Sequence, residues 1–347
     1  MSTAPICLSS PVDVLSAVPH LLGFHPSQSL VLVCLSSSHG QSARVGMIAR
    51  IDLPEEGHAD EVADALLPAV AREDPDAAVL IAYGTPEDDG TVAAEVLSAA
   101  LTEVGVRVRA RLVVFEERWQ SIDSPDRNVW AVVPGPDAAP SLEFAVVTGS
   151  APVASRSVLE GRCAAGPRAD AVGRECARLL LTDSEVTVER GTAVWGRLLR
   201  DGTDLAGFSD AAVALAAVSL HAGGTPALRD ALAGWLTPGF LTAQEMHPVA
   251  LAGLREHVPL PWWESPQRQA DPATAARLLD RLIQVAGCLP DPYAVPVLTV
   301  LAHTAWNQGN GIIARVALDR ARAADPAYYL AALLDRMFTE GMQPRAV

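Results

Sequence analysis

Lysine is absent from this chain of 347 residues, and all 26 basic residues are arginine. The Walker A phosphate-binding loop and the protein kinase active site each need a lysine, so both classes of enzyme are excluded. Schiff-base chemistry and a pyridoxal phosphate anchor are excluded as well, because both form on a lysine amine. The composition therefore removes several large enzyme classes before any motif is considered.

Cysteine is scarce and widely spaced. No pair has the Cys-x-x-Cys spacing of a zinc ribbon or a thioredoxin-like site, and no His-Glu-x-x-His motif occurs. We therefore expect no metal and no cofactor. The five cysteines are Cys7, Cys34, Cys163, Cys176 and Cys288. Cys34 lies in a buried-strand pattern and Cys176 in a helical one, and both are expected to be small apolar core residues.

Positive charge is also in deficit, since the formal net charge is -15. Nucleic-acid binding depends on neutralising phosphates with basic side chains, and so does docking on anionic lipid. No apolar run reaches the length of about 18 residues that a membrane span needs. The start of the chain lacks the basic and apolar regions of a signal peptide. We therefore expect a cytoplasmic protein with no nucleic-acid and no membrane partner.

Strand and helix patterns alternate through the first 150 residues. Apolar residues at helical spacing predict helices at 11–22, 59–72 and about 90–104. Runs of apolar and β-branched residues predict strands at 29–35, 44–53, 77–83 and 106–115, and 128–133 is expected to pair with the last of these. These elements predict an α/β domain over residues 1–150, a mixed sheet with flanking helices.

Strand signals nearly vanish after residue 151, and helices separated by glycine and proline remain. The sequence therefore predicts an all-α domain over residues 151–347. Near its end, Trp306-Asn307-Gln308-Gly309, the small Ala314 and Ala321, and Asp325-Pro326 resemble one unit of a tetratricopeptide repeat at about 295–325. Helices are expected at 295–306 and 327–337, on either side of the repeat's second helix.

Several segments resemble an actinobacterial family known as domain of unknown function 4192. The opening segment Val18–Leu35 carries the resemblance, together with Arg118-Trp119 followed by Ser121, and Val316–Ala321. The resemblance implies a family and no activity. Paired cysteines that members of the family carry after the arginine-tryptophan segment are missing here, so no metal or redox role transfers.

The turn at residues 24–29, Phe-His-Pro-Ser-Gln-Ser, is the first candidate site. His25 can titrate near neutrality and so act as an acid, a base or a ligand, and Ser27 and Ser29 can donate hydrogen bonds. The alternative is a turn fixed by proline, in which the serines satisfy backbone groups.

Thr85 follows a buried strand at Gly84-Thr85-Pro86, where α/β sheets bind ligands. Backbone amides at the start of the next helix could hold an anion. The carboxylates of Glu87, Asp88 and Asp89 would repel phosphate, and the alternative is an ordinary capped loop.

Arg107, Arg109 and Arg111 alternate along a predicted strand and are expected to share one face. With Arg118 and Arg127 they would form an anion-binding patch, and Trp119 beside Arg118 is a further candidate ligand-binding residue. The alternative is a solvated face whose arginines pair with nearby carboxylates.

Two main functions remain open, beside a purely structural role in a larger assembly, which would predict a contiguous exposed apolar patch. The first is a non-catalytic protein that binds a ligand or partner through the turn at 24–29, with the helical domain supplying a protein-binding surface. The second is an enzyme acting on an anionic or nucleotide-like small molecule, with His25 and Ser29 as reacting groups and the arginines as a clamp. The two are distinguished by whether the turn and the arginine strand converge. A homo-oligomer is compatible with either.

Overall fold

The computed structural model describes most of the chain in two compact units, Met1–Arg156 and Ser157–Val347. The described residues are 10–36, 44–55, 57–85, 87–126, 129–135, 138, 152–182, 186–200, 204–221, 227–237, 240–258, 272–340 and 342. The first unit extends beyond the predicted boundary at residue 150, because Val153 hydrogen-bonds back to Gly23 and His25.

The first unit is built on one six-stranded mixed sheet with the strand order β2-β1-β3-β4-β5-β6. Strands β1 and β2 are antiparallel, β3 is antiparallel to β1, and β3 and β4 are parallel. The parallel pair is connected through helix α3, as a parallel crossover requires. The strands are β1 (Ser29–Ser36), β2 (Arg44–Asp52), β3 (Ala77–Tyr83), β4 (Arg107–Phe115), β5 (Arg118–Ser121) and β6 (Ala131–Val132).

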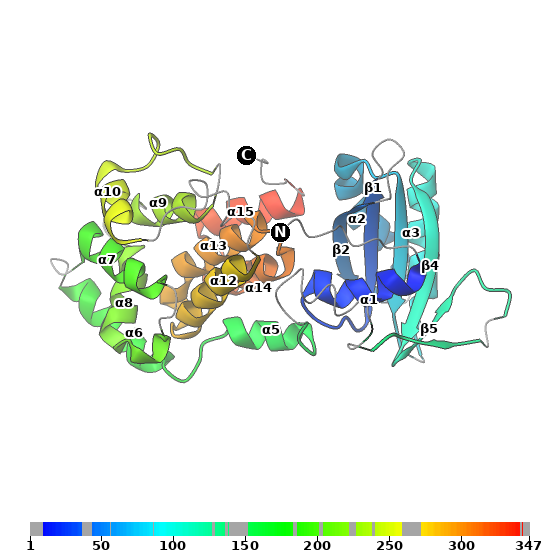
Figure 1. The fold of residues 1–347 in the computed structure, drawn as a ribbon, viewed down its shortest axis with the longest axis horizontal. Helices are drawn as coiled ribbons and strands as arrows, with labels where there is room; N and C mark the ends of the chain where they lie inside the picture. Colours follow the sequence, from blue (N-terminus) through cyan, green and yellow to red (C-terminus); the bar gives the residue numbers. More distant parts are fainter. Residues whose placement is uncertain are drawn as a thin grey trace. The chain divides into compact units, whose positions relative to one another are not determined.

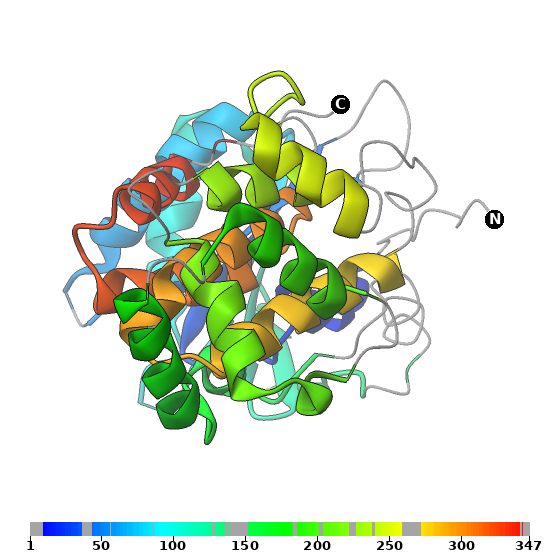
Figure 2. The ribbon, with the colours of Figure 1, turned by 90° about the vertical axis from the view of Figure 1, so that its left-hand side faces the viewer.

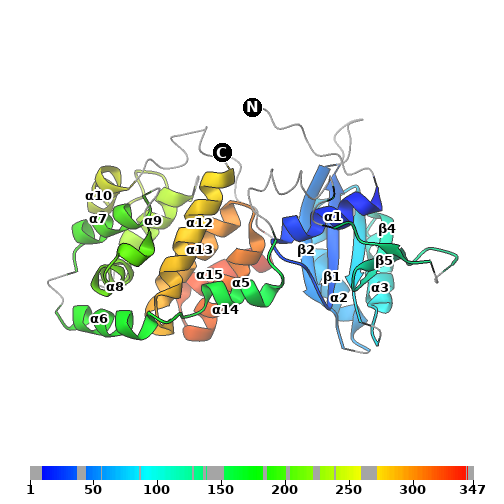
Figure 3. The same ribbon diagram turned by 60° about the horizontal axis from the view of Figure 1, so that its bottom comes forward.

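Helices cover both faces of this sheet. Helix α1 (Pro11–Leu22) lies across one face, and α2 (Ala59–Glu73) and α3 (Thr91–Glu103) lie on the other (Figures 1 and 3). The second face packs the alternate residues Leu30, Leu32 and Leu80 against α2 and α3. Central strands covered on both sides read as continuous apolar runs, which is why β1 and β3 were recognisable in the sequence.

Strand β5 was not predicted, and it changes the expected strand order. Segment 128–133 was expected to pair with the strand now labelled β4, but β6 pairs with β5. The sequence gives no sign of the tight turn that joins β4 to β5, in which Glu116 takes a positive φ of 53°. Such turns usually carry glycine or asparagine at that position, so a glutamate gave no indication of a hairpin.

The second unit is helical throughout its described residues (Figures 1 and 2). Its core is one continuous apolar cluster in which most of α13 is buried. No helix among the described residues is both long and apolar enough to cross a bilayer. The elements are α5 (Arg156–Cys163), α6 (Ala169–Leu181), α7 (Val188–Leu198), the 3-10 turn η2 (Leu205–Gly207), α8 (Asp210–Ser219), α9 (Ala227–Leu236), α10 (Pro248–His257), α12 (Pro272–Gly287), α13 (Asp291–Asn307), α14 (Gly311–Ala324) and α15 (Tyr329–Thr339).

The helix pair α13 and α14 has the expected small-residue contact. Gly309 turns the chain with a φ of 75°, and the fully buried Ala314 and Ala321 allow close approach. The last helix begins at Tyr329 rather than at residue 327, because the Asp325 carboxylate accepts the Ala327 N–H at 3.0 Å in a turn. The tetratricopeptide resemblance itself stays a prediction.

Candidate functional site

The turn after α1 is tied down by backbone hydrogen bonds. Gly23 ends the helix with a φ of 75°, which a glycine adopts without strain. The Val153 N–H donates to the Gly23 carbonyl at 2.9 Å, and the His25 N–H donates to the Val153 carbonyl at 3.0 Å. The side chain of Phe24 is buried. The turn is therefore fixed by its backbone, while the His25 side chain remains exposed.

The Ser29 hydroxyl forms two hydrogen bonds that stabilise the turn. Ser29 is fully buried; its Oγ donates to the Ser27 carbonyl at 2.6 Å and accepts from Arg50 Nε at 2.7 Å. Arg50 in turn pairs with Asp52 at 2.5 Å. This network stabilises the turn and leaves His25 and Ser27 as the sequence-predicted side chains that face solvent there.

The loop that holds Thr85 is organised by its own polar groups. Thr85 Oγ1 accepts the Asp88 N–H at 3.1 Å, and the Thr85 N–H donates to the Asp88 carbonyl at 2.7 Å. The carboxylates of Asp88 and Asp89 accept the N–H groups of Gly90 and Thr91 at the start of α3, both at 2.9 Å. These amides are already capped by carboxylates, so they do not form an anion site.

The two loops lie together at one edge of the sheet. Leu53, directly after β2, donates its N–H to the Gln28 carbonyl at 3.0 Å. A Cβ built on Gly90 would come within 2.8 Å of the Leu53 side chain, so Leu53 also contacts the start of α3. Leu53 therefore joins the His25 loop to the Thr85 loop.

Strand register brings Arg118 and Trp119 to the same edge. Ser29 pairs with Tyr83, Tyr83 with Val114, and Val114 with Trp119, so these four residues form one row across the sheet. Arg118 pairs with Phe115 beside the turn at Glu116. We call this end of the sheet the loop edge; it comprises residues 24–29, 52–53, 84–85, 87–90 and 115–119. Six of the eight sequence-predicted site residues lie here, His25, Ser27, Ser29, Thr85, Arg118 and Trp119.

Arg107 and Arg109 lie at the opposite end of the sheet. Arg107 pairs with Ala77, and Ala77 pairs with Leu35, which is the far end of β1 from Ser29. At about 3.3 Å per residue this separation is about 20 Å. The structure therefore does not bring these two arginines to His25, and Arg127 lies outside the described residues.

The expectation that Arg107, Arg109 and Arg111 share one face is wrong. Val108 pairs with Ala78 but Ala110 pairs with the next residue, Val79, so a bulge at Arg109 shifts the alternation by one residue. Arg107 and Arg111 consequently lie on opposite faces. Arg111 donates to the carboxylate of Asp123, which raises the pKa of the Arg111 guanidinium.

Carboxylates dominate the charge of the loop edge. Arg118 is the one arginine in the loop-edge ranges, and it is exposed; Arg50 approaches from within β2 and is already bonded to Ser29 and Asp52. A surface of this sign attracts cations and basic proteins and repels phosphates. The carboxylates belong to Asp52, Glu87, Asp88, Asp89, Glu116 and Glu117.

Trp119 carries an unusual buried donor. Its indole Nε1 is buried and has no hydrogen-bond partner among the residues that the structure describes. An unpaired buried N–H costs free energy, so we expect Trp119→Phe to leave the free energy of unfolding unchanged or to raise it by about 1 kcal/mol. Urea unfolding of the purified variant measures this.

The matched control is Trp195→Phe in the helical unit. Trp195 is fully buried and its Nε1 donates to the Ala216 carbonyl at 3.0 Å, so this variant should lose about 2 kcal/mol. An equal loss in both variants would show that the Trp119 N–H is paired in solution.

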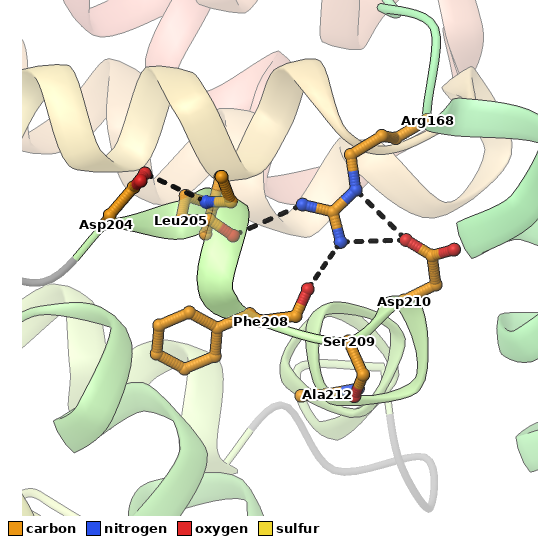
Figure 4. Close-up of polar contacts among 8 residues, drawn as sticks. Arg168, Asp204, Leu205, Phe208, Ser209, Asp210 and Ala212 are labelled. Carbon is orange, nitrogen blue, oxygen red and sulfur yellow. Dashed lines mark hydrogen bonds and ion pairs between the residues drawn. The ribbon is translucent and has the colours of Figure 1, made fainter.

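The helical unit holds a polar constellation that was not anticipated from the sequence. Arg168 donates through Nε and Nη2 to Asp210 at 3.0 and 2.7 Å, and to the carbonyls of Leu205 and Phe208 at 3.2 and 2.7 Å (Figure 4). Each guanidinium nitrogen is thus directed at a protein group. The network fixes the turn before α8 and is structural.

Two buried ionisable side chains, His303 and Cys34, are held in their neutral forms. His303 is buried and its Nδ1 lies 3.2 Å from Thr237 Oγ1; burial lowers the pKa of His303 to about 4, so the ring is neutral. Burial raises the pKa of the Cys34 thiol to about 12, so it is no nucleophile. Among the described residues no three His, Cys, Asp or Glu side chains are grouped as metal ligands.

The described units define a mixed α/β sheet with a loop-bearing edge, followed by a helical unit. The sequence matches the family described as Domain of unknown function (DUF4192) over residues 11–345, and the chain belongs to that family. No curated protein and no solved structure matches it. The resemblance read from Val18–Leu35 is therefore confirmed, and it brings a family without an activity.

Proposed function

We propose that this protein binds another protein through the loop edge of its α/β unit, and that the partner presents a positively charged surface there. One observation carries the proposal: four segments far apart in the sequence meet at one end of the sheet, and three of them expose carboxylates. Loops held by a rigid sheet are common binding elements. The hydroxyl groups of Ser29 and Thr85 form hydrogen bonds within these loops and hold them in place.

The alternative, an enzyme acting on an anionic small molecule, has less support. Its clamp was expected from Arg107, Arg109, Arg111 or Arg118, and strand register separates Arg107 and Arg109 from His25. Arg118 is the remaining arginine of that set at the loop edge, and it lies beside Glu116 and Glu117. The surrounding carboxylates would repel an anionic substrate.

Site-specific photo-cross-linking tests the proposal. A benzophenone amino acid at Ser27 should capture a partner from an extract of cells that make the protein, whereas the same group at Arg109 should not. Reversing two exposed loop-edge charges, Glu87→Arg with Glu117→Arg, should lower the yield of the adduct about tenfold, which corresponds to about 1.4 kcal/mol. Added salt should lower it as well.

The control reversal is Glu103→Arg, at the end of α3 away from the loop edge, which should leave the yield unchanged. Equal capture from Ser27 and Arg109, or insensitivity to the double reversal, would overturn the proposal. A captured small molecule that needs Arg118 would favour the enzyme instead.

A further inference from the structure

The two outer strands of the sheet differ in how their open sides are protected. At β2, Val33 pairs with Ile48 and Leu35 with Val45, so Gly46 and Met47 bulge opposite Cys34. The Met47 N–H donates to the carboxylate of Glu73 at 3.0 Å. A bulge and a charged side chain on the edge are devices that prevent a further strand from pairing. The β2 edge is therefore closed to another strand.

On the outer side of β6, the strand at the other end of the sheet, no described strand is paired. Val132 pairs with Arg118. The next residue, Val133, donates its N–H to the Glu117 carbonyl at 2.8 Å. In an antiparallel ladder, residues that exchange hydrogen bonds alternate with residues that do not. The N–H and C=O of Val132 therefore point away from β5, toward the open side.

The side chains of this edge are suited to strand pairing. Residues 129–133 read Val-Trp-Ala-Val-Val, without a charge, and such residues favour strands. Val129 is 64% exposed and Val132 is 70% exposed. Exposed, uncharged edges are sites where another chain adds a strand. Pro134 follows directly and limits the added segment to a few residues.

We propose that β6 takes up a short extended segment of a basic partner protein by strand addition. This inference rests on the proposed function and names how the partner is held. Glu117, whose carbonyl accepts the Val133 N–H, and its neighbour Glu116 expose their carboxylates beside β6. Basic side chains on the added strand would pair with them. A second copy of this chain, with its net charge of -15, is a poorer occupant than a basic partner because like charges repel.

The test uses a peptide probe of six residues that alternates valine and arginine, with blocked ends and a fluorescent label. Fluorescence polarisation should show binding to the full chain. Val132→Pro removes the outward N–H without removing a hydrogen bond to β5, and should raise the Kd about tenfold. Val132→Thr keeps that N–H and should leave the Kd unchanged. The same peptide N-methylated at alternate residues should bind about tenfold more weakly to the unaltered protein.

The N-methylated peptide keeps the test valid if Val132→Pro fails to fold. Equal affinity for both peptides would overturn strand addition, because binding would then be electrostatic. A dimer by light scattering that dissociates in Val132→Pro, with no peptide binding, would overturn it in favour of a second copy. Cross-linking from Ser27 that survives Val132→Pro would overturn strand addition alone and leave the proposed function standing.

Discussion

Replacing Arg320 with alanine is expected to lower the free energy of unfolding of the helical unit by about 3 to 5 kcal/mol. Arg320 projects from α14 and its side chain is only 12% exposed. Its guanidinium donates to the carbonyls of Ala286 at 3.0 Å, Leu289 at 2.7 Å and Cys163, and to Asp291 at 2.9 Å. One side chain thus caps the ends of α5 and α12.

The size of the effect follows from what the substitution leaves behind. Carbonyl groups at helix ends lack partners within the helix and depend on other donors. Hydrogen bonds from a charged group contribute about 1.5 to 3 kcal/mol each, and buried acceptors left unpaired carry a desolvation penalty. Urea unfolding followed by helical circular dichroism measures the loss.

Arg336→Ala is the matched control. Arg336 also donates from Nε to a carboxylate, Glu340 at 2.7 Å, but its side chain is 76% exposed and, among the described residues, it donates to no carbonyl at a helix end. Exposed pairs of this kind contribute little, so the midpoint should not move. Equal midpoints for the two variants would contradict the capping role of Arg320.

The second large effect is expected for Gly196→Ala, which should destabilise the helical unit by about 3 kcal/mol. Gly196 lies in α7, and the last residue of α10, His257, packs against it. A Cβ at this position would lie 2.6 Å from the His257 carbonyl carbon and closer still to its oxygen. The obstacle is backbone, which cannot rotate away as a side chain can.

Gly161→Ala in α5 is the control, because it changes helix propensity in the same way without a steric clash. A Cβ on Gly161 would meet no atom within 4 Å, so alanine should raise the free energy of unfolding by about 0.5 to 1 kcal/mol. The thermal midpoints of the two variants should therefore move in opposite directions. A midpoint for Gly196→Ala that is unchanged or raised would show that α7 and α10 are not in close contact at Gly196.

The sequence predicted the buried elements well because their patterns depend on local composition. The strand at 77–83 matches β3 to the residue, and the α1 boundaries agree as well. The α/β class and the helical second half are both confirmed by the structure. Each of these predictions rests on the spacing of apolar residues along one segment, which can be read without knowing what that segment packs against.

The candidate site was predictable only in part, because its geometry depends on strand pairing. The bulge at Arg109 arises from the register between β4 and β3, and a single strand carries no sign of it. The turn at Glu116 lacked the glycine that marks a hairpin. Arg168 and Arg320 were missed because their partners are mostly backbone carbonyls more than 30 residues away.

The backbone bridge from Val153 to Gly23 and His25 bears on how the α/β unit can be separated from the rest of the chain. A fragment cut at residue 150 would lose the strand-like contact that pairs Val153 with Phe24. The apolar ring of Phe24 would then be released along with the turn it anchors. A fragment that ends at Arg156 keeps this closure, so limited proteolysis should yield a folded piece only when cleavage falls beyond Val153.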